Sequence, residues 1–532
     1  MNSASLVTLR NAQVVKLAEV PQLDITAFLA CIWERTRNGD RISALFGTPD
    51  ESGKTRLYAV LSDDRHGTLS CLSAAVLDRY PSLTPDCAQA HLFEREIAEQ
   101  WGILPEGHPW LKPIRFHHSY RPVAQHSVSN DPGLQSPSQN RPGQHNQGQD
   151  LWSRKAGEPI APSVIDYFKM TGEEMHQVAV GPIHAGVIEP GSFRFQCHGE
   201  TVYHLEISLG YQHRGIERQL VGGPNKRTIH YMETLAGDTS IGHTLAYCQA
   251  IEALAGCRVP ARAQVMRGVG LELERLANHT GDLGGLATDV GFLPTASYCG
   301  RLRGDWLNTT GLWCGNRFGR SAIVPGGIRF DIGLDYVKQM EDRIASARKG
   351  LTGAASLLFD STSALARFED TGTVSRADCN ALAMVGPAAR ACGVERDVRH
   401  DFPSGIYRFV HIPVSSVGLG DVFARAYVRW LECQRSIDFL QEQLPMLPAG
   451  AARVDCGPLQ PESLVVSLTE GWRGEICHVA LTDKAGRFSA YKVVDPSFHN
   501  WAGLQMALRN QAISDFPVCN KSFSLSYCGH DL

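Results

Sequence analysis

A segment with almost nothing to bury divides this chain of 532 residues. From Val123 to Asp150 the sequence is rich in Ser, Gln, Asn, Pro and Gly and contains no aromatic residue. Such a segment cannot offset the entropy lost on ordering, so we expect a flexible linker. Because the chain is also too long for one hydrophobic core, we predict a small N-terminal domain at 1–122, a linker at 123–155 and a large domain at 156–532.

The N-terminal part mixes strand-like and helical patterns. Arg56 to Ser62 reads as a strand, and Ile25 to Thr36 (ITAFLACIWERT) reads as a helix, which together favour an α+β domain. The part ends in His91 to Phe116, where a charged helix start precedes an aromatic loop punctuated by Gly and Pro. We expect this last segment to be a docking surface rather than a catalytic one.

The large part begins with a hairpin pattern and then becomes helical. A Glu-Pro-Gly-Ser turn precedes alternating apolar residues, and a second alternating run follows: Phe193, Phe195, Cys197, then Leu205, Ile207, Leu209. Two later stripes have helical spacing: Met266, Val269, Leu273, Leu276, and Val422, Ala426, Trp430, Cys433, Ile437, Leu440. The pattern predicts the α+β class, with a small β element followed by a large, mainly helical bundle.

A polar stripe runs along the second of these helices, opposite its apolar face. It consists of Arg425, Arg429, Glu432 and Ser436, at spacings of four, three and four. On an isolated helix this would be a solvated side, whereas in a larger packed assembly it would be a buried polar network. The sequence alone leaves both interpretations open.

Charge and cysteine usage exclude several classes of protein. The net charge is −4 and no long run of like charge occurs, so a nucleic-acid partner is not expected. No apolar stretch has the length of a membrane helix, and the N-terminus lacks the pattern of a signal peptide, so we expect a cytoplasmic chain that reaches a membrane only through partners. The fifteen cysteines include no Cys-x-x-Cys pair, which favours reduced, packed thiols over disulfides or a metal site.

Several segments carry a specific resemblance. The segments 181–195 (GPIHAGVIEPGSFRF), 209–220 (LGYQHRGIERQL), 270–292 (GLELERLANHTGDLGGLATDVGF) and 470–501 (EGWRGEICHVALTDKAGRFSAYKVVDPSFHNW) resemble the large subunit of energy-converting nickel–iron hydrogenases, such as that of formate hydrogenlyase. They also resemble, less closely, the 49 kDa quinone-site subunit of complex I. The segment 93–109 (FEREIAEQWGILPEGHP) resembles the 30 kDa subunit of complex I, which some bacteria fuse ahead of the 49 kDa subunit.

The sequence departs from the hydrogenases at the metal ligands. The family carries two Cys-x-x-Cys pairs whose four thiolates hold nickel and iron. The resemblance places Ala236 and Thr239 at the first pair and Ser497 and Asn500 at the second. Hydroxyl and amide oxygens are hard, weak donors and Ala donates nothing, whereas nickel bound by four cysteines depends on soft thiolate sulfur. We therefore expect no metal on this chain.

The resemblance also suggests the protonatable residues of the site. His184 matches a histidine of the complex I quinone loop, although it could simply cap that loop. Glu189 matches the proton-transfer glutamate of hydrogenases, although it could be an ordinary turn residue. His243 matches a hydrogenase histidine and could equally be a satisfied core residue. Asp238 and Asp495 are expected at the emptied cavity, where burial would raise their pKa values; their alternative role is helix or loop capping.

The resemblance implies a catalytic-core subunit of a membrane-associated oxidoreductase complex, peripheral at the cytoplasmic face of the inner membrane. The implied partners are an iron–sulfur small subunit, similar to the 20 kDa subunit of complex I, and antiporter-like membrane subunits, in a hetero-oligomer. The iron–sulfur cluster would belong to the small subunit, and a quinone is the candidate acceptor. The sequence has no Gly-rich dinucleotide loop, so NAD would act only at another subunit. Two alternatives stay open, a hydrogen-evolving nickel–iron hydrogenase and a non-catalytic scaffold.

Overall fold

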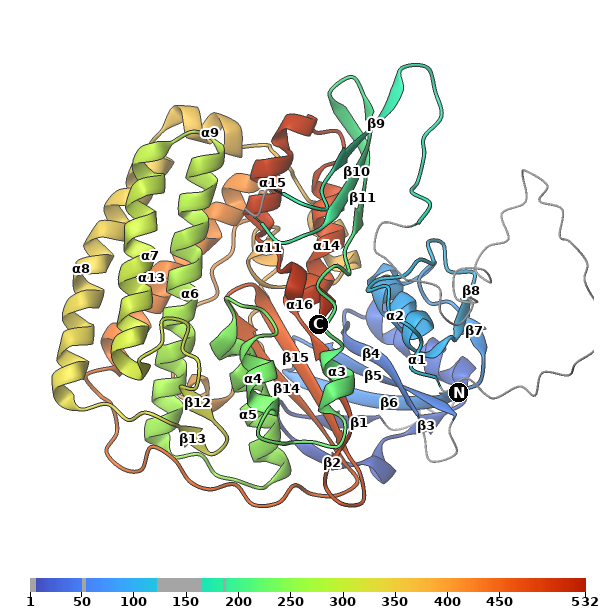
Figure 1. Ribbon diagram of the computed structural model, residues 1–532, viewed down its shortest axis with the longest axis horizontal. Helices are drawn as coiled ribbons and strands as arrows, with labels where there is room; N and C mark the ends of the chain where they lie inside the picture. The colour runs from blue at the N-terminus through green and yellow to red at the C-terminus, as the bar shows by residue number, and fades with distance from the viewer. Residues whose placement is uncertain (1–5, 50–53, 122–164, 185–187) are drawn as a thin grey trace, which may run out of the picture.

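The computed structural model describes residues 6–49, 54–121, 165–184 and 188–532. The linker predicted at 123–155 lies outside these residues, and so do both of its boundaries, so the domain limits remain predictions. Figure 1 shows the N-terminal residues in blue on one side, a group of long helices on the other, and short sheets between them.

The N-terminal region forms a five-stranded sheet covered by helices, which confirms the α+β prediction there. The strand order is β1-β6-β5-β4, and β3 pairs with β6 in parallel. The side chain of Asp24 accepts a hydrogen bond from the Ala27 N–H and so begins the first helix. The elements are β1 (Val7–Leu9), β3 (Gln22–Leu23), α1 (Ile25–Arg37), β4 (Arg41–Pro49), β5 (Thr55–Asp63), β6 (Thr68–Val76), β7 (Arg79–Pro81), α2 (His91–Trp101) and β8 (Leu104–Glu106).

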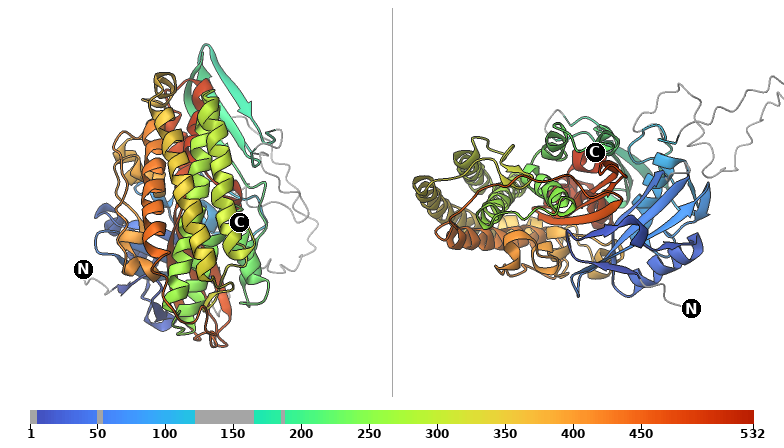
Figure 2. Two further views of the ribbon diagram at one scale, coloured as in Figure 1. Left: turned by 90° about the vertical axis from the view of Figure 1, so that its left-hand side faces the viewer. Right: turned by 90° about the horizontal axis from the view of Figure 1, so that it is seen from below.

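Five long helices form the bundle that the sequence predicts. They are α5 (Ser240–Leu254), α6 (Ala261–Asp289), α7 (Leu293–Cys314), α8 (Leu334–Phe359) and α13 (Val422–Gln443). Helix α6 packs against α7 and α13, and α7 packs against α8, so the longest helices stand side by side (Figures 1 and 2). Both predicted apolar stripes lie on α6 and α13 and are buried except for the half-buried Trp430.

Shorter elements connect the bundle to the sheets. The helices are α3 (Ile216–Leu220), α4 (Thr228–Glu233), α9 (Thr362–Phe368), α10 (Arg376–Ala381), α11 (Gly386–Arg390), α12 (Val398–Asp401), α14 (Pro496–Ala507), α15 (Phe516–Phe523) and α16 (Tyr527–Asp531). The 3-10 turns are Leu17–Glu19, Ala88–Ala90, Gly405–Arg408 and Ile513–Asp515, and β12 (Ile323–Val324) pairs with β13 (Gly327–Ile328). Within the described ranges, no helix combines the length and apolarity that crossing a membrane requires.

The predicted hairpin is confirmed as part of a three-stranded sheet. Strand β10 (Ser192–His198) pairs with β11 (Thr201–Ser208) and, on its other edge, with β9 (Met175–Val180). In Figure 1 this sheet projects beyond the bundle.

A second sheet in the large part has no counterpart in the sequence prediction. It has the order β16-β15-β14-β2 and consists of β2 (Val14–Lys16), β14 (Ser463–Gly471), β15 (Gly474–Thr482) and β16 (Phe488–Val494). Every residue of β14 and β15 is buried, so neither strand shows the alternation of a half-exposed strand. Leu464 and Val466 join the core of the N-terminal sheet, whereas Val465 and Ala480 join the core of the bundle. This sheet therefore separates the two cores and belongs to both.

The segment His91–Phe116 docks onto the large part of the same chain. Glu96 on α2 forms a buried ion pair with Lys492 on β16 at 2.6 Å. The Arg115 Nε donates to the backbone oxygen of His530 at 2.9 Å. The docking surface predicted from this segment is thus used inside the protein, where it fixes the N-terminal region against β16 and α16.

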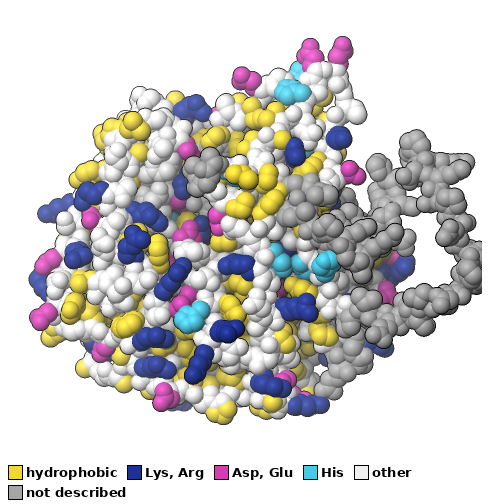
Figure 3. Space-filling view, viewed as in Figure 1, with side chains coloured by type: hydrophobic (Ala, Val, Ile, Leu, Met, Phe, Trp, Pro, Cys, Tyr) yellow, Lys and Arg dark blue, Asp and Glu magenta, His cyan; other side chains and the backbone are white. Residues whose placement is uncertain are grey.

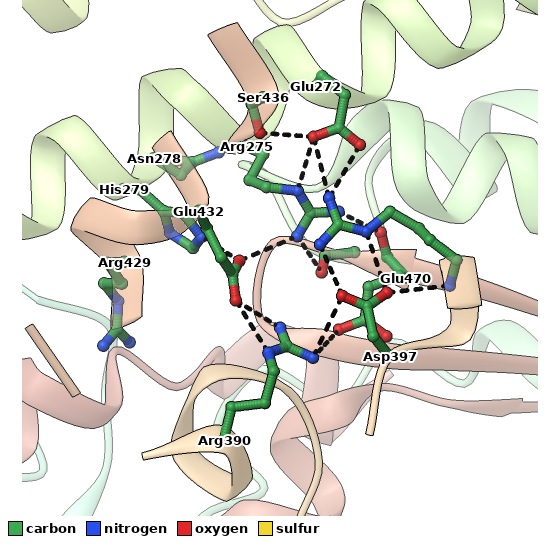
Figure 4. A network of polar contacts seen from close by, with 12 residues as sticks. Glu272, Arg275, Asn278, His279, Arg390, Asp397, Arg429, Glu432, Ser436 and Glu470 are labelled. Carbon is green, nitrogen blue, oxygen red and sulfur yellow. Dashed lines mark hydrogen bonds and ion pairs between the residues drawn. The ribbon is translucent and has the colours of Figure 1, made fainter. Parts of the chain in front are cut away.

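The polar stripe on α13 is buried, which decides between the two interpretations of the sequence. Its four side chains, Arg425, Arg429, Glu432 and Ser436, have 0–1% of their surface exposed. Figure 4 shows Glu432 and Ser436 in a network of carboxylates and guanidinium groups between α6, α13 and β14, with Arg429 beside it. A helix face this polar lies inside the protein only because nearly every charge on it has a partner.

Candidate functional site

The four positions that the resemblance matches to metal ligands are all buried. Ala236 and Thr239 stand in the loop before α5, and Ser497 and Asn500 lie in the first turn and a half of α14. The Ser497 Oγ accepts the Ser526 N–H at 2.8 Å. This contact leaves the hydroxyl engaged in joining α14 to the segment before α16.

The amide of Asn500 is also committed to the fold. Its Oδ1 accepts the Val385 N–H and its Nδ2 donates to the Val385 carbonyl, both at 3.0 Å. With two hydroxyls, one amide and one methyl at these positions, the donor set does not fit nickel. Among the residues that the structure describes, no group of three His, Cys, Asp or Glu side chains is arranged to hold a metal ion.

An ion pair lies beside the first two of these positions. Arg473, at the turn between β14 and β15, binds both carboxylate oxygens of Asp238 at 2.6 and 2.8 Å. Its Nη1 also reaches the Thr239 hydroxyl at 3.3 Å, and its guanidinium lies 3.9 Å from the ring centre of Trp472. Asp238 is partly open, with 35% of its side chain exposed, so the pair forms a charged wall that a ligand could reach.

A chain of hydrogen bonds joins four buried side chains of the site. The His243 Nε2 lies 3.0 Å from the Asp495 Oδ2, and its Nδ1 lies 3.1 Å from the Nε2 of His478. The Nδ1 of His478 lies 2.9 Å from the Tyr491 hydroxyl. Three elements supply these groups: α5 carries His243, the β15–β16 pair carries His478 and Tyr491, and the residue before α14 is Asp495.

The chemistry of the four groups fixes where the hydrogens lie. Asp495 is a carboxylate and only accepts, so the Nε2 of His243 carries a hydrogen. Burial lowers the pKa of His478 far below its ordinary value, so this ring is neutral. When His243 is neutral, His478 donates to it and Tyr491 donates to His478. When His243 takes a proton, both of those hydrogen bonds reverse. The chain can therefore accept one proton at His243 and pass the change along to Tyr491.

The expectation that burial would raise the pKa of Asp495 is wrong. Burial does act in that direction, but the hydrogen bond and charge of His243, followed by the charge of Arg473, lower the pKa below its ordinary value. The Asp495 Oδ1 also accepts the Ser497 N–H at 2.8 Å and so caps α14. Asp495 therefore fulfils the capping alternative and also stays ionised, as a fixed negative charge for His243 rather than as a proton carrier.

Glu189 and His184 lie at the base of the three-stranded sheet, outside this chain of hydrogen bonds. Glu189 accepts the backbone N–H of Tyr527 at 3.1 Å, at the start of α16. The His184 Nε2 lies 3.0 Å from the Gly191 carbonyl, across the hairpin loop. Glu189 thus binds the residue next to Ser526, whose own N–H binds Ser497, whereas His184 fixes its own loop. Residues 185–187 between them lie outside the described residues.

A cavity of about 520 Å³ lies elsewhere. It opens between the end of α5, the start of α6 and the turn Gly405–Arg408. The four ligand positions do not line it. Cavity size alone therefore does not identify the site.

The sequence prediction missed three residues of the site: Arg473, His478 and Tyr491. All lie in the segment 470–501, whose resemblance to the hydrogenases assigns them no role. A signal was present at His478, because a histidine within the apolar run of β15 has to find a buried partner. Their partners are remote in sequence, since His243 and His478 are 235 residues apart.

The fused α+β region, the helical bundle and the buried protonatable site together define one component of a larger oxidoreductase assembly. The sequence profile described as respiratory-chain NADH dehydrogenase, 49 Kd subunit, matches residues 289–458, and that of the 30 Kd subunit matches residues 18–131. The chain belongs to this family, as a fusion of the 30 kDa-like and 49 kDa-like parts.

Curated relatives come from both branches that the sequence indicated. The carbon monoxide-induced hydrogenase of Rhodospirillum rubrum is 31% identical over 346 residues, which cover 64% of this chain and 95% of that protein. Formate hydrogenlyase subunit 5 of Escherichia coli is 26% identical over 504 residues, 92% of this chain and 84% of the relative. The fused C/D component of the NADH-quinone oxidoreductase of Bacteroides thetaiotaomicron is 27% identical over 421 residues, 77% of this chain and 78% of the relative. These matches confirm a catalytic-core role within an oxidoreductase complex.

Proposed function

We propose that this chain forms the electron-acceptor side of a membrane-associated oxidoreductase complex and works without nickel. An iron–sulfur small subunit would deliver electrons, and this chain would supply the protons that the acceptor takes up. A quinone is the acceptor class favoured, because relatives bear the name NADH-quinone oxidoreductase. The observation that carries the proposal is the pairing of two features: four metal-ligand positions without a thiolate, and a buried proton chain beside them.

The chemistry of each side chain gives it a separate role in this function. Asp238 and Arg473 form the accessible wall, where the guanidinium can donate hydrogen bonds to an oxygen that gains negative charge. His243 holds a proton between the fixed charge of Asp495 and the neutral ring of His478. Movement of that proton toward the wall would accompany electron arrival, and Tyr491 would then restore the hydrogen-bond pattern.

A basic surface beside the site supports docking of an acidic partner face. In Figure 3, Lys and Arg side chains gather over α3, α4 and the connection after α7. The exposed members are Arg214, Arg218, Lys226, Arg227, Arg317 and Arg320. Arg214 donates to the carbonyls of Thr234 and Leu235, in the loop that leads to Ala236, so this surface borders the site. We propose that the small subunit docks on this basic surface. The antiporter-like membrane subunits at the cytoplasmic face would attach through other surfaces of the complex.

Metal and acceptor assays on the intact complex test the proposal. The complex, purified from cells grown with added nickel, is expected to contain iron from its clusters but no stoichiometric nickel, and to reduce a soluble quinone analogue without evolving dihydrogen. Elemental analysis, gas chromatography and quinone absorbance provide the measurements. A parallel preparation with cysteine at positions 236, 239, 497 and 500 is the matched control for nickel uptake. One nickel per wild-type complex, or dihydrogen evolution, would contradict the proposal.

A further inference from the structure

A buried carboxylate on α6 binds the first turn of α5 beside the site and has no role in the proposed function so far. Glu274 has 8% of its surface exposed. Its two oxygens accept the backbone N–H groups of Ile241 and Gly242, at 2.7 and 3.1 Å, in the first turn of α5. Within the described ranges it forms no ion pair with a Lys, Arg or His, in contrast to Glu272 on the same helix, which binds two arginines.

A small cavity connects Glu274 to both the site and the surface. Its volume is about 10 Å³, on the scale of a single water molecule. Asp238 and Asn278 line it on the side of the site, and Asn278 donates one hydrogen bond to each of the backbone carbonyls of Asp238 and Glu274, both at 2.9 Å. On the other side it is lined by Arg303 from α7 and by the exposed Arg317 from the basic surface.

We propose that Glu274 carries protons between the solvent and the Asp238–Arg473 wall of the site, through the cavity that Glu274 and Asp238 share. The proton leaves the Glu274 carboxyl for the Asp238 carboxylate or for the acceptor beyond it, and a solvent proton entering past Arg317 replaces it. No bond between heavy atoms changes. The assignment rests on the proposed function for its destination, but its first step, proton exchange at Glu274, stands on the geometry alone.

The charges around Glu274 suit a proton carrier. Burial is the largest influence on it and raises the pKa of Glu274 to about 8, with the negative charge of Asp238 adding to the rise and the two N–H groups and Arg275 opposing it. Arg275 is held by Glu272 and Arg473 by Asp238, so neither guanidinium neutralises Glu274 directly. Arg303 and Arg317 complete the charged groups that line its cavity. The group therefore gains and loses its proton near neutral pH.

The direction in which stability changes with pH gives a first test of this proposal. Because the folded pKa of Glu274 lies above its ordinary value of 4.5, its contribution to stability is full below pH 4.5 and is lost as pH rises toward about 8. The substitution Glu274→Gln keeps the acceptor for the α5 N–H groups and cannot ionise. We expect the denaturation midpoint of this variant to fall less between those two pH values than that of the wild type.

Infrared spectroscopy and turnover together test the proposal. The carbonyl band of one protonated carboxyl is expected to disappear near pH 8, to shift in D₂O as its proton exchanges, and to be missing from Glu274→Gln. In the intact complex the variant is expected to reduce the quinone analogue about 100-fold more slowly, the low end of a proton-transfer contribution. It should also lack the decline in rate that we expect of the wild type above pH 8.

Glu94→Gln is the matched control. Glu94 is another buried carboxylate whose pKa burial raises, held by hydroxyls and the N–H groups of Leu83 and Thr84, but it lies in the N-terminal region. This variant should keep the Glu274 carboxyl band and full turnover. An absent Glu274 band at every pH, or full turnover in Glu274→Gln when Asp495→Asn is impaired, would overturn the assignment. Full turnover in both of these site variants would instead contradict the proposed function.

Discussion

Replacing Glu432 with Gln lowers the free energy of unfolding by about 3–5 kcal/mol, the range for breaking a buried ion pair from one side. Glu432 lies on α13 with 1% of its side chain exposed and binds Arg390 at 2.7 Å and His279 at 2.8 Å. A second guanidinium, that of Arg275, lies at 3.5 Å (Figure 4). The amide of Gln has nearly the same shape but no charge, so these groups stay buried while their shared anion is lost.

The network around Glu432 shows why no neighbouring group can replace the lost negative charge. Arg275 also binds Glu272, and Arg390 also binds Glu470 on β14 at 2.9 Å. Each carboxylate in the network already binds a guanidinium, so none is free to replace Glu432. The effect should spread across the contact of α6 and α13 with the second sheet rather than stay on one helix.

Urea denaturation of the purified chain measures this prediction. Asp438→Asn is the matched control, because Asp438 lies on the same helix in an ion pair with Arg348 at 2.9 Å, and both side chains are more than two-fifths exposed. That variant should lose less than about 1 kcal/mol. If the two variants cost the same, the buried network does not stabilise the fold as we infer.

The dependence of stability on pH in the acid range gives a second test of Glu432. Burial acts to raise the pKa of Glu432, but Arg390 and the hydrogen bond from His279 hold it well below 4.5. A lowered folded pKa means that this contribution to stability is present above pH 4.5 and is lost as pH falls toward the folded value. Since Gln has no such titration, Glu432→Gln should show a shallower loss of stability below pH 4.5 than the wild type.

Local pattern was sufficient to predict the elements whose two faces differ. The stripe on α13 and the alternation of Phe193 and Phe195 each have one apolar side, and both elements form as expected. Strands β14 and β15 were missed because both of their faces are buried, one against each core. Their sequences therefore show no alternation of apolar and polar residues. The polar side of α13 was ambiguous for a related reason: periodicity places Glu432 on a face, but only the fold brings Arg390 to it.

The sequence suggested the residues of the candidate site but not the contacts between them. The resemblance identified His243, Asp238 and Asp495, and the structure places all three around the emptied ligand positions. It could not show that Asp495 reaches His243 across 252 residues, or that Arg473 binds Asp238 across 235. Those contacts set the charge of each group, which is why the direction of the Asp495 pKa could not be derived from burial alone.

Asp495→Asn is expected to reduce quinone-analogue turnover by the intact complex about 100-fold, with little change in KM. The carboxylate stabilises a proton on His243, and a neutral amide does not, so the variant should lose the advantage that a positioned acid–base group provides. Folding should survive, because Asn is as good an N-cap as Asp and can still accept the Ser497 N–H. Comparison of kcat with KM under saturating donor gives the measurement.

Asp421→Asn separates the charge at the site from the capping of a helix. Asp421 caps α13 by accepting the Ala424 N–H at 2.7 Å, so the same chemical change is made at an equivalent cap without a histidine partner. This variant should keep turnover close to that of the wild type. Because Tyr491→Phe removes only the far end of the hydrogen-bond chain, its loss should be smaller than that of Asp495→Asn. A Tyr491→Phe complex that is more impaired than Asp495→Asn would mean that protons reach His243 through Tyr491, and that the fixed charge of Asp495 is not what holds them there.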